Sequence, residues 1–404
     1  MPAAHVASAV GNALAVAALL MLLEQLLLRR GSSPTIRLPA AAAIAGAVLY
    51  LPHILRQHPG LGVLAGAASI TTAAKILSAA LYTQEMPCLK AGWFPGALIL
   101  ACAKDCWQPH TLVPRPSRAQ QVPEKTPASS QFAWQPAPPV VTQVIAALRW
   151  CLVYDVLCEL LLRLWPEGQL GSKGQLGLLA ASVLLGMAQW VQFAMGHHML
   201  CLSITLHHRA ALLLLRLLRL PLPSFLATGP LLLPPPGVTS PWHSTSLQDL
   251  WGKRWHQYFR SDHYNLAQRP TQAALDWAGS RLGTGVTASP HWRNIRRAVT
   301  VMAVFVFSGL FHEYMNWAGL GISDGMHLAF FTVHGLGLLL EEKLAAPGKD
   351  VDPAVLQARR AALLCFLVAT SPLFALPWLQ AGYHLQLLRP LHIVGPVLDI
   401  AFRR

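Results

Sequence analysis

The stretch Ala298–Ala318, AVTVMAVFVFSGLFHEYMNWA, decides the fold class of this chain. It is apolar over most of its length and long enough for a helix to cross a bilayer, which takes about 20 residues. Working outward from it, we predict further membrane segments at residues 6–28, 40–55, 60–82, 93–103, 140–165, 175–204, 326–340, 361–379 and 391–402. The sequence therefore predicts roughly eight to ten membrane segments.

The composition agrees with a membrane protein. Of the 404 residues, 54% are hydrophobic and 12% are charged, whereas soluble domains carry about 25% charged residues. A water-soluble chain could not hide so much apolar surface with so few charges, and disordered, collagen-like and small disulfide-bonded classes are excluded as well. We predict an all-α, polytopic transmembrane helical bundle, integral to the membrane and multi-pass.

Charge and cysteine content exclude further classes. The formal net charge of +14 comes from basic residues that lie mostly between the apolar runs, which argues against nucleic acid and favours anionic lipid or an anionic cosubstrate. The seven cysteines are scattered without a C-x-x-C pair, so neither disulfides nor zinc are expected. The histidine pairs at 197–198 and 207–208 lack metal-ligand spacing, and we predict no metal.

The chain divides into three regions by amino-acid composition. Residues 1–103 are expected to hold N-terminal transmembrane helices, and residues 104–139 a Pro-rich cytosolic loop. Residues 140–404 form a second membrane region whose motif core lies at about 240–345. Within it, residues 210–220 are apolar on one side and basic on the other, which predicts an interfacial helix.

The motif Ser308-Gly-Leu-Phe-His312-Glu313 contains the residues best suited to catalysis. Ser308 and His312 are four residues apart and share one helix face, and Gly309 permits the close approach of another backbone or of a substrate. A histidine in this setting can take up and return a proton. A packing histidine is the alternative, but Glu313 adds a second ionisable group inside the membrane, which favours function.

A second motif, Leu250–Arg260 (LWGKRWHQYFR), is too polar to span a membrane. The spacing of Ser246 and Asp249 predicts a capped helix start, and Trp251 and Trp255 lie on one face of the expected interfacial helix.

This motif has two interpretations. One is an aromatic anchor at the membrane surface with basic side chains reaching water. The other places His256 and Gln257 in a cavity, while Lys253, Arg254 and Arg260 attract a phosphorylated ligand. The basic residues at 293–297 would serve the same ligand.

A third feature is His334-Gly335, with Glu341 seven residues later on the same face. The pair is either functional or a packing histidine beside a glycine contact.

The first two motifs together resemble those of the membrane-bound O-acyltransferases, and within them the wax-synthase-like branch. The residues that carry the resemblance are Asp249–Gln257 and Ser308–Glu313, with Phe330–Gly335 and Glu341 following. The resemblance implies an all-helical membrane fold with an internal tunnel, and acyl transfer from acyl-CoA to a hydroxyl. The family's near-invariant histidine corresponds to His312, and its second functional position, often asparagine, corresponds to His256.

The resulting hypothesis is an acyl-CoA-dependent long-chain-alcohol O-fatty-acyltransferase of the endoplasmic reticulum. His312 and His256 are its catalytic residues, with His312 as general base and a donor at 256–257 stabilising the oxyanion. Acyl-CoA is a cosubstrate, no cofactor and no covalent acyl-enzyme are required, and long-chain alcohol and membrane lipids are the expected partners. The expected substrate-binding residues are Trp251, Lys253, Arg254, Trp255, Gln257, Arg260, Ser308, Glu313 and His334.

Three alternatives stay open. The acceptor could be a sterol or diacylglycerol, or another acceptor such as a protein. The chain could be a transporter or channel, with His312, Asp155 and Glu159 on a polar pathway. It could also be an inactive scaffold.

Overall fold

The computed structural model describes residues 33–50, 52–53, 59–82, 135–166, 174–221, 231–233, 238–255, 257–344, 352–386 and 392–402. Most of these residues are helical, which confirms the all-α prediction. The short strands β1 (Gln135–Pro136) and β2 (Leu232–Leu233) pair antiparallel. The segments expected at 6–28 and 93–103, and residues 104–134 of the expected loop, lie outside the described residues.

The chain forms two compact units. The first comprises Met1–Leu112 and Pro241–Gln386, and the second comprises Val113–Ser240 and Leu387–Arg404. The N-terminal helices and the motif core therefore share one unit, while the region expected at 140–404 contributes to both.

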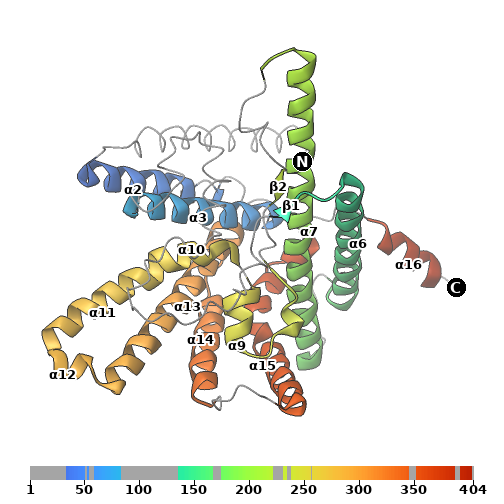
Figure 1. Cartoon of the computed structure of the whole chain (residues 1–404). Coiled ribbons are helices and arrows are strands. Elements are labelled where there is room, and N and C mark those ends of the chain that lie inside the picture. The colour runs from blue at the N-terminus through green and yellow to red at the C-terminus, as the bar shows by residue number, and fades with distance from the viewer. Residues whose placement is uncertain are drawn as a thin grey trace. The chain divides into compact units, whose positions relative to one another are not determined.

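In the described part of the first unit the long helices are α2 (Pro34–Tyr50), α3 (Pro59–Leu81), α13 (Pro290–Leu320), α14 (Met326–Leu344) and α15 (Pro353–Gln380). Helix α13 packs against α3 and α14, α3 packs against α2, and α14 packs against α15 (Figure 1). The shorter elements are η4 (Pro241–His243), α9 (Leu247–Asp249), η5 (Leu250–Arg254), η6 (Gln257–Phe259), α10 (Arg260–His263), η7 (Tyr264–Gln268), α11 (Arg269–Leu282), α12 (Thr284–Thr287) and η8 (Tyr383–Gln386).

Helix α13 is longer at its start than the apolar stretch that predicted it. Ser289 accepts a hydrogen bond from the Trp292 N–H (3.1 Å) as N-cap, and Pro290 occupies the first turn, where its missing N–H costs nothing. Gly321 follows the last helical residue as C-cap, and its φ of 74° is the left-handed conformation that glycine adopts readily. A polar first turn thus precedes the apolar segment.

Glycines set the close contacts of α13. A Cβ at Gly319 would lie 2.5 Å from the Val63 backbone nitrogen of α3, and a Cβ at Gly309 would lie 2.8 Å from the Leu328 Cα of α14. Small residues at such crossings let membrane helices approach closely. Of the two roles predicted for Gly309, the structure shows the approach of another backbone.

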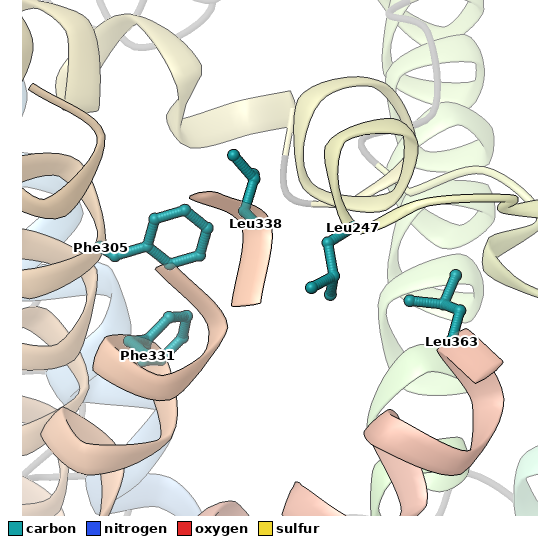
Figure 2. Close-up of a cluster of buried hydrophobic side chains, with 5 residues drawn as sticks. All are labelled: Leu247, Phe305, Phe331, Leu338 and Leu363. Carbon is teal, nitrogen blue, oxygen red and sulfur yellow. The ribbon is translucent and has the colours of Figure 1, made fainter. Parts of the chain in front are cut away.

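A buried apolar cluster joins three of the long helices to α9 (Figure 2). Its members are Leu247, Phe305, Phe331, Leu338 and Leu363. Trp251 packs against this cluster, so the Trp-rich motif is anchored on the core of the unit.

The second unit contains α6 (Val140–Leu164), α7 (Gly174–Leu217) and α16 (Val394–Phe402). The separate interfacial helix predicted at 210–220 is wrong, since α7 continues without a break to Leu217. No glycine or proline lies between residues 204 and 217 to end it. Helices α6 and α7 are joined where the Thr205 hydroxyl donates to Gln143 Oε1 (3.1 Å).

The segment at 391–402 is not a full membrane span. Helix α16 has 9 residues, about 14 Å of helix against a hydrocarbon core of about 30 Å. Asp155 Oδ2 accepts the backbone N–H groups of Ile393 and Val394, both at 3.0 Å, and so caps this helix. This contact gives the Asp155 side chain a structural role.

Among the described residues, α7, α13 and α15 are long and apolar enough to cross a membrane. This finding supports an integral membrane protein. The total of eight to ten segments stays a prediction.

Candidate active site

His312 lies on α13, about two turns before the helix ends at Leu320. Its Nδ1–H donates to the Ser308 carbonyl oxygen one turn earlier (2.8 Å), which places the lone pair of the neutral imidazole on Nε2. The side chain is half-buried. The rings of Phe331 and Phe374 lie 4.5 and 5.6 Å from it, centroid to centroid, so His312 stands among aromatic side chains with its basic nitrogen defined.

Ser308 is bound to a histidine that was not predicted from the sequence. The Ser308 hydroxyl donates to His263 Nε2 (2.7 Å), while His263 Nδ1–H donates to the Phe259 carbonyl oxygen (2.7 Å). The second bond fixes the tautomer of His263, so its Nε2 is the acceptor. The predicted serine therefore links α10 to α13 at the turn that also orients His312.

Next to His263, Asp262 forms a buried ion pair. Its carboxylate lies 3.2 Å from Lys75 Nζ of α3, and its side chain is 2% exposed. Burial raises the pKa of Asp262, an effect that Lys75 opposes. Burial also lowers the pKa of His263, which keeps it neutral at physiological pH as the bond from Ser308 requires. The ion pair holds α10 against α3 and so supports His263.

Glu313 serves the neighbouring helix. Its Oε1 accepts the Leu328 N–H (3.1 Å), and its Oε2 accepts the Gly325 N–H and the Ser323 hydroxyl, both at 3.3 Å. These groups lie at the start of α14, where backbone N–H groups lack helical partners. The residue predicted to bind substrate thus caps α14; its part in substrate binding stays a prediction.

The Trp-rich motif is not one regular helix, and that prediction is wrong. Ser246 does accept the Asp249 N–H (2.8 Å) as predicted. However, the helix turns after α9 are π-type and end at Trp255, whose φ of −113° and ψ of 136° are extended. The two tryptophans still meet, with ring centroids 6.5 Å apart.

His334 joins this motif to the long helices. Trp251 Nε1–H donates to His334 Nδ1 (3.1 Å), and His334 Nε2–H donates to Thr370 Oγ1 of α15 (3.0 Å). Glu341 Oε2, on the same face of α14, accepts the Leu247 N–H (2.8 Å). Because both ring nitrogens of His334 are engaged and its side chain is fully buried, the geometry fits the packing interpretation.

The basic residues of the motif have different surroundings. Arg254 Nε donates to Asp249 Oδ2 (2.7 Å). Lys253 Nζ lies 3.9 Å from Asp249 Oδ1, and the Lys253 side chain is 73% exposed. Arg260 is exposed, with Nη1 3.5 Å from both the Gly252 carbonyl oxygen and Gln257 Oε1.

The basic first turns of α13 are also paired. Arg296 lies 2.8 Å from Asp276 Oδ1, and Arg297 pairs with Glu342.

The second predicted catalytic position, His256, lies outside the described residues. Its neighbour Gln257 is buried, and its amide Nε2 donates to the Trp255 carbonyl oxygen (3.0 Å). The predicted donor at 256–257 stays a prediction.

The two motifs meet directly, where the Phe259 and Phe311 rings lie 5.4 Å apart, centroid to centroid, and also through a shared ring of α14. Phe331 lies 4.5 Å from the His312 ring and 5.6 Å from the Trp251 ring, centroid to centroid. Both motifs therefore contact the same side chain of α14.

Three polar residues near His312 were not predicted from the sequence: His263, Asn316 and His327. Asn316 follows His312 by four residues and His327 precedes His334 by seven, and this helical spacing could have revealed them. His263 follows His256 by the same seven residues, but the extended backbone at Trp255 shows that the motif is not one continuous helix.

Comparison with known proteins agrees with this architecture. The sequence model of the Membrane bound O-acyl transferase family matches residues 234–333, about a quarter of the chain. The matched region holds the Trp-rich motif, Ser308, His312 and the first turns of α14. No curated protein sequence matches the chain. Over residues 234–333 the chain is therefore similar to the membrane-bound O-acyltransferases.

Proposed function

We propose that this protein transfers a fatty acyl group from acyl-CoA to the hydroxyl of a long-chain alcohol, making a wax ester. The family match supports acyl transfer in a membrane. The apolar helices α7, α13 and α15 support two substrates whose chains stay in lipid. The proposal includes the endoplasmic reticulum as the location.

The observation that carries the proposal is the fixed tautomer of His312. Its Nδ1–H is held by the Ser308 carbonyl oxygen (2.8 Å), so Nε2 holds the basic lone pair. An alcohol hydroxyl is a weak nucleophile and needs such a base. Because the ring packs against Phe331 and Phe374, an alkyl chain beside it would meet an apolar surface.

The chemical step uses His312 as a proton carrier. Nε2 takes the hydroxyl proton as the alcohol oxygen attacks the thioester carbon. The tetrahedral intermediate then collapses, the C–S bond breaks, and the imidazolium returns the proton to the departing thiolate. Ester and CoA–SH are formed, and the histidine ends neutral as it began.

Other residues position this base in the proposal. The Ser308 carbonyl oxygen orients the ring, and the Ser308 hydroxyl is tied to His263 (2.7 Å). Lys75 and Asp262 hold the element that carries His263.

The acyl donor would be recruited by charge. Lys253 and Arg260 are exposed basic residues of the Trp-rich motif. They are the groups proposed to attract the CoA phosphates, since charge-assisted hydrogen bonds to phosphate are among the strong ones.

The experiment compares purified His312→Ala with wild type, using labelled palmitoyl-CoA and hexadecanol. General-base catalysis contributes about 10²–10⁴-fold, so ester formation should fall at least a hundredfold. His291→Ala is the matched control, because His291 is exposed in the first turn of the same helix. Undiminished ester synthesis by a folded His312→Ala variant would exclude the proposal.

The acceptor is tested separately by offering hexadecanol, cholesterol and diacylglycerol in parallel. We expect the highest kcat/KM with hexadecanol. If only sterol or diacylglycerol is acylated, His312 keeps its role and the acceptor assignment is wrong. Turnover of none of them would leave a protein acceptor and the transporter and scaffold alternatives.

A further inference from the structure

Two fully buried polar atoms near His312 lack hydrogen-bond partners within the described part of the chain: Asn316 Nδ2 and His327 Nδ1. Both residues are 0% exposed. An unpaired buried polar group is costly, and more so within a membrane, where no bulk water can satisfy it. Such atoms call for an occupant that the described residues do not supply.

The chemistry of both atoms is fixed by their neighbours. Trp378 Nε1–H can only donate, and it lies 2.6 Å from the Asn316 side chain, so the contacting atom is Oδ1 and Nδ2 is a donor. His327 Nε2 lies 2.7 Å from the Phe374 carbonyl oxygen and must donate to it, so Nδ1 of the neutral ring is an acceptor. One donor, Asn316 Nδ2, and one acceptor, His327 Nδ1, therefore lack hydrogen-bond partners among the described residues.

These two residues lie around the proposed base. Asn316 follows His312 by one helical turn, which places both on one face of α13. The His327 ring lies 5.8 Å from the His312 ring and 5.3 Å from the ring of Trp378, which binds Asn316. Helices α13, α14 and α15 thus bring a donor, an acceptor and a base into one cluster.

We propose that Asn316 and His327 form a hydroxyl-binding subsite beside His312, which receives the acceptor alcohol. The alcohol oxygen accepts from Asn316 Nδ2–H, and its single O–H donates to His327 Nδ1 in the binary complex. For acyl transfer the O–H turns from His327 to His312 Nε2, whose ring lies beside that of His327 (5.8 Å, centroid to centroid). A thioester carbonyl oxygen could accept from Asn316 but would leave His327 unfilled. A water molecule has the same chemistry as the alcohol and occupies the subsite in its absence.

This inference rests on the proposed function for the identity of the alcohol, but binding can be measured without turnover. Full-length protein in detergent is titrated with tritiated hexadecanol, and with 1-methoxyhexadecane as competitor, in the absence of acyl-CoA. The ether accepts a hydrogen bond but cannot donate one. We expect wild type to bind the alcohol about tenfold more tightly than the ether, the value of one hydrogen bond.

Two variants separate the contacts. Asn316→Asp keeps the acceptor for Trp378 but replaces the unpaired donor, and should weaken hexadecanol binding about tenfold. His327→Phe should bind alcohol and ether equally. Thr332→Val is the matched control, because it removes a polar group of α14 whose hydroxyl already donates to the Leu328 carbonyl oxygen (2.7 Å). It should retain the wild-type preference for the alcohol.

The outcomes are distinguishable. Equal binding of alcohol and ether by wild type, undiminished hexadecanol binding by folded Asn316→Asp, or an unchanged preference in folded His327→Phe overturns the inference. If both variants melt at lower temperature without ligand but bind alcohol and ether as wild type does, the atoms hold only structural water, and the acceptor site is elsewhere. If wild type binds the alcohol selectively but makes no ester from palmitoyl-CoA, the proposed function fails and the subsite stands.

Discussion

A substitution of Glu313 tests whether this residue of the Ser308–Glu313 motif stabilises the fold or binds substrate. The sequence places it beside the proposed base as a substrate-binding residue, whereas the structure shows three donors from the start of α14 converging on its two oxygens. Glu313→Gln separates these roles, because glutamine keeps the volume and one acceptor oxygen but replaces the other with an amide that only donates.

The size of the effect follows from those contacts. Whichever way the amide turns, either the Gly325 or the Leu328 N–H loses its acceptor. Loss of a hydrogen bond to a charged group costs about 1.5–3 kcal/mol, and less at Gly325, which is exposed. Loss of the negative charge at the helix start adds about 0.3–1 kcal/mol. We expect the free energy of unfolding to fall by about 1–4 kcal/mol, visible as a drop of several degrees in Tm.

The assay is tryptophan fluorescence on heating in detergent, together with acyl transfer at permissive temperature. Glu342→Gln is the control, since Glu342 pairs with Arg297 at the edge of the bundle and exposed pairs contribute about 0–1 kcal/mol. Because α14 carries Phe331, which packs on His312, kcat should fall along with Tm. An unchanged Tm with a raised KM for one substrate would refute the capping role and favour the substrate role.

Further predictions concern the contacts around α13. Ser308→Ala removes the hydroxyl that binds His263 but leaves the carbonyl oxygen that orients His312, so kcat should fall about tenfold with little change in either KM, as steady-state kinetics would show. Gly319→Ala would place a Cβ 2.5 Å from the Val63 nitrogen, and the overpacking should lower the free energy of unfolding by about 1–3 kcal/mol. An unaltered Tm would contradict the close contact between α13 and α3. Since burial lowers the pKa of His263 below its usual 6.5, the unfolded chain binds its proton first on acidification. The stability that neutral His263 supports should be complete above about pH 6.5 and decline below it, and a His263→Gln variant should show a flatter Tm between about pH 7.5 and 5.

Part of the site follows from helical spacing. Because α13 is regular, the shared face of Ser308 and His312 and the close backbone contact at Gly309 could be predicted, and both are found. The Trp-rich motif shows the limit of this reasoning. Its polar and aromatic pattern suits a helix, but Trp251 reaches into the core and donates to His334, and these tertiary contacts accompany an irregular backbone.

The sequence by itself determined the environment of the chain and its secondary structure. It has too few charges for a water-soluble protein, and its apolar runs suit helices in a bilayer. It also placed His312 on the face of Ser308, because residues of one helix keep a fixed spacing. Only the tertiary structure decided that His263 binds Ser308, that Glu313 caps α14, and that Asn316 and His327 lie around His312. The physical reason is that hydrogen bonds between helices depend on how the helices cross, and helical periodicity carries no information about the partner across that crossing.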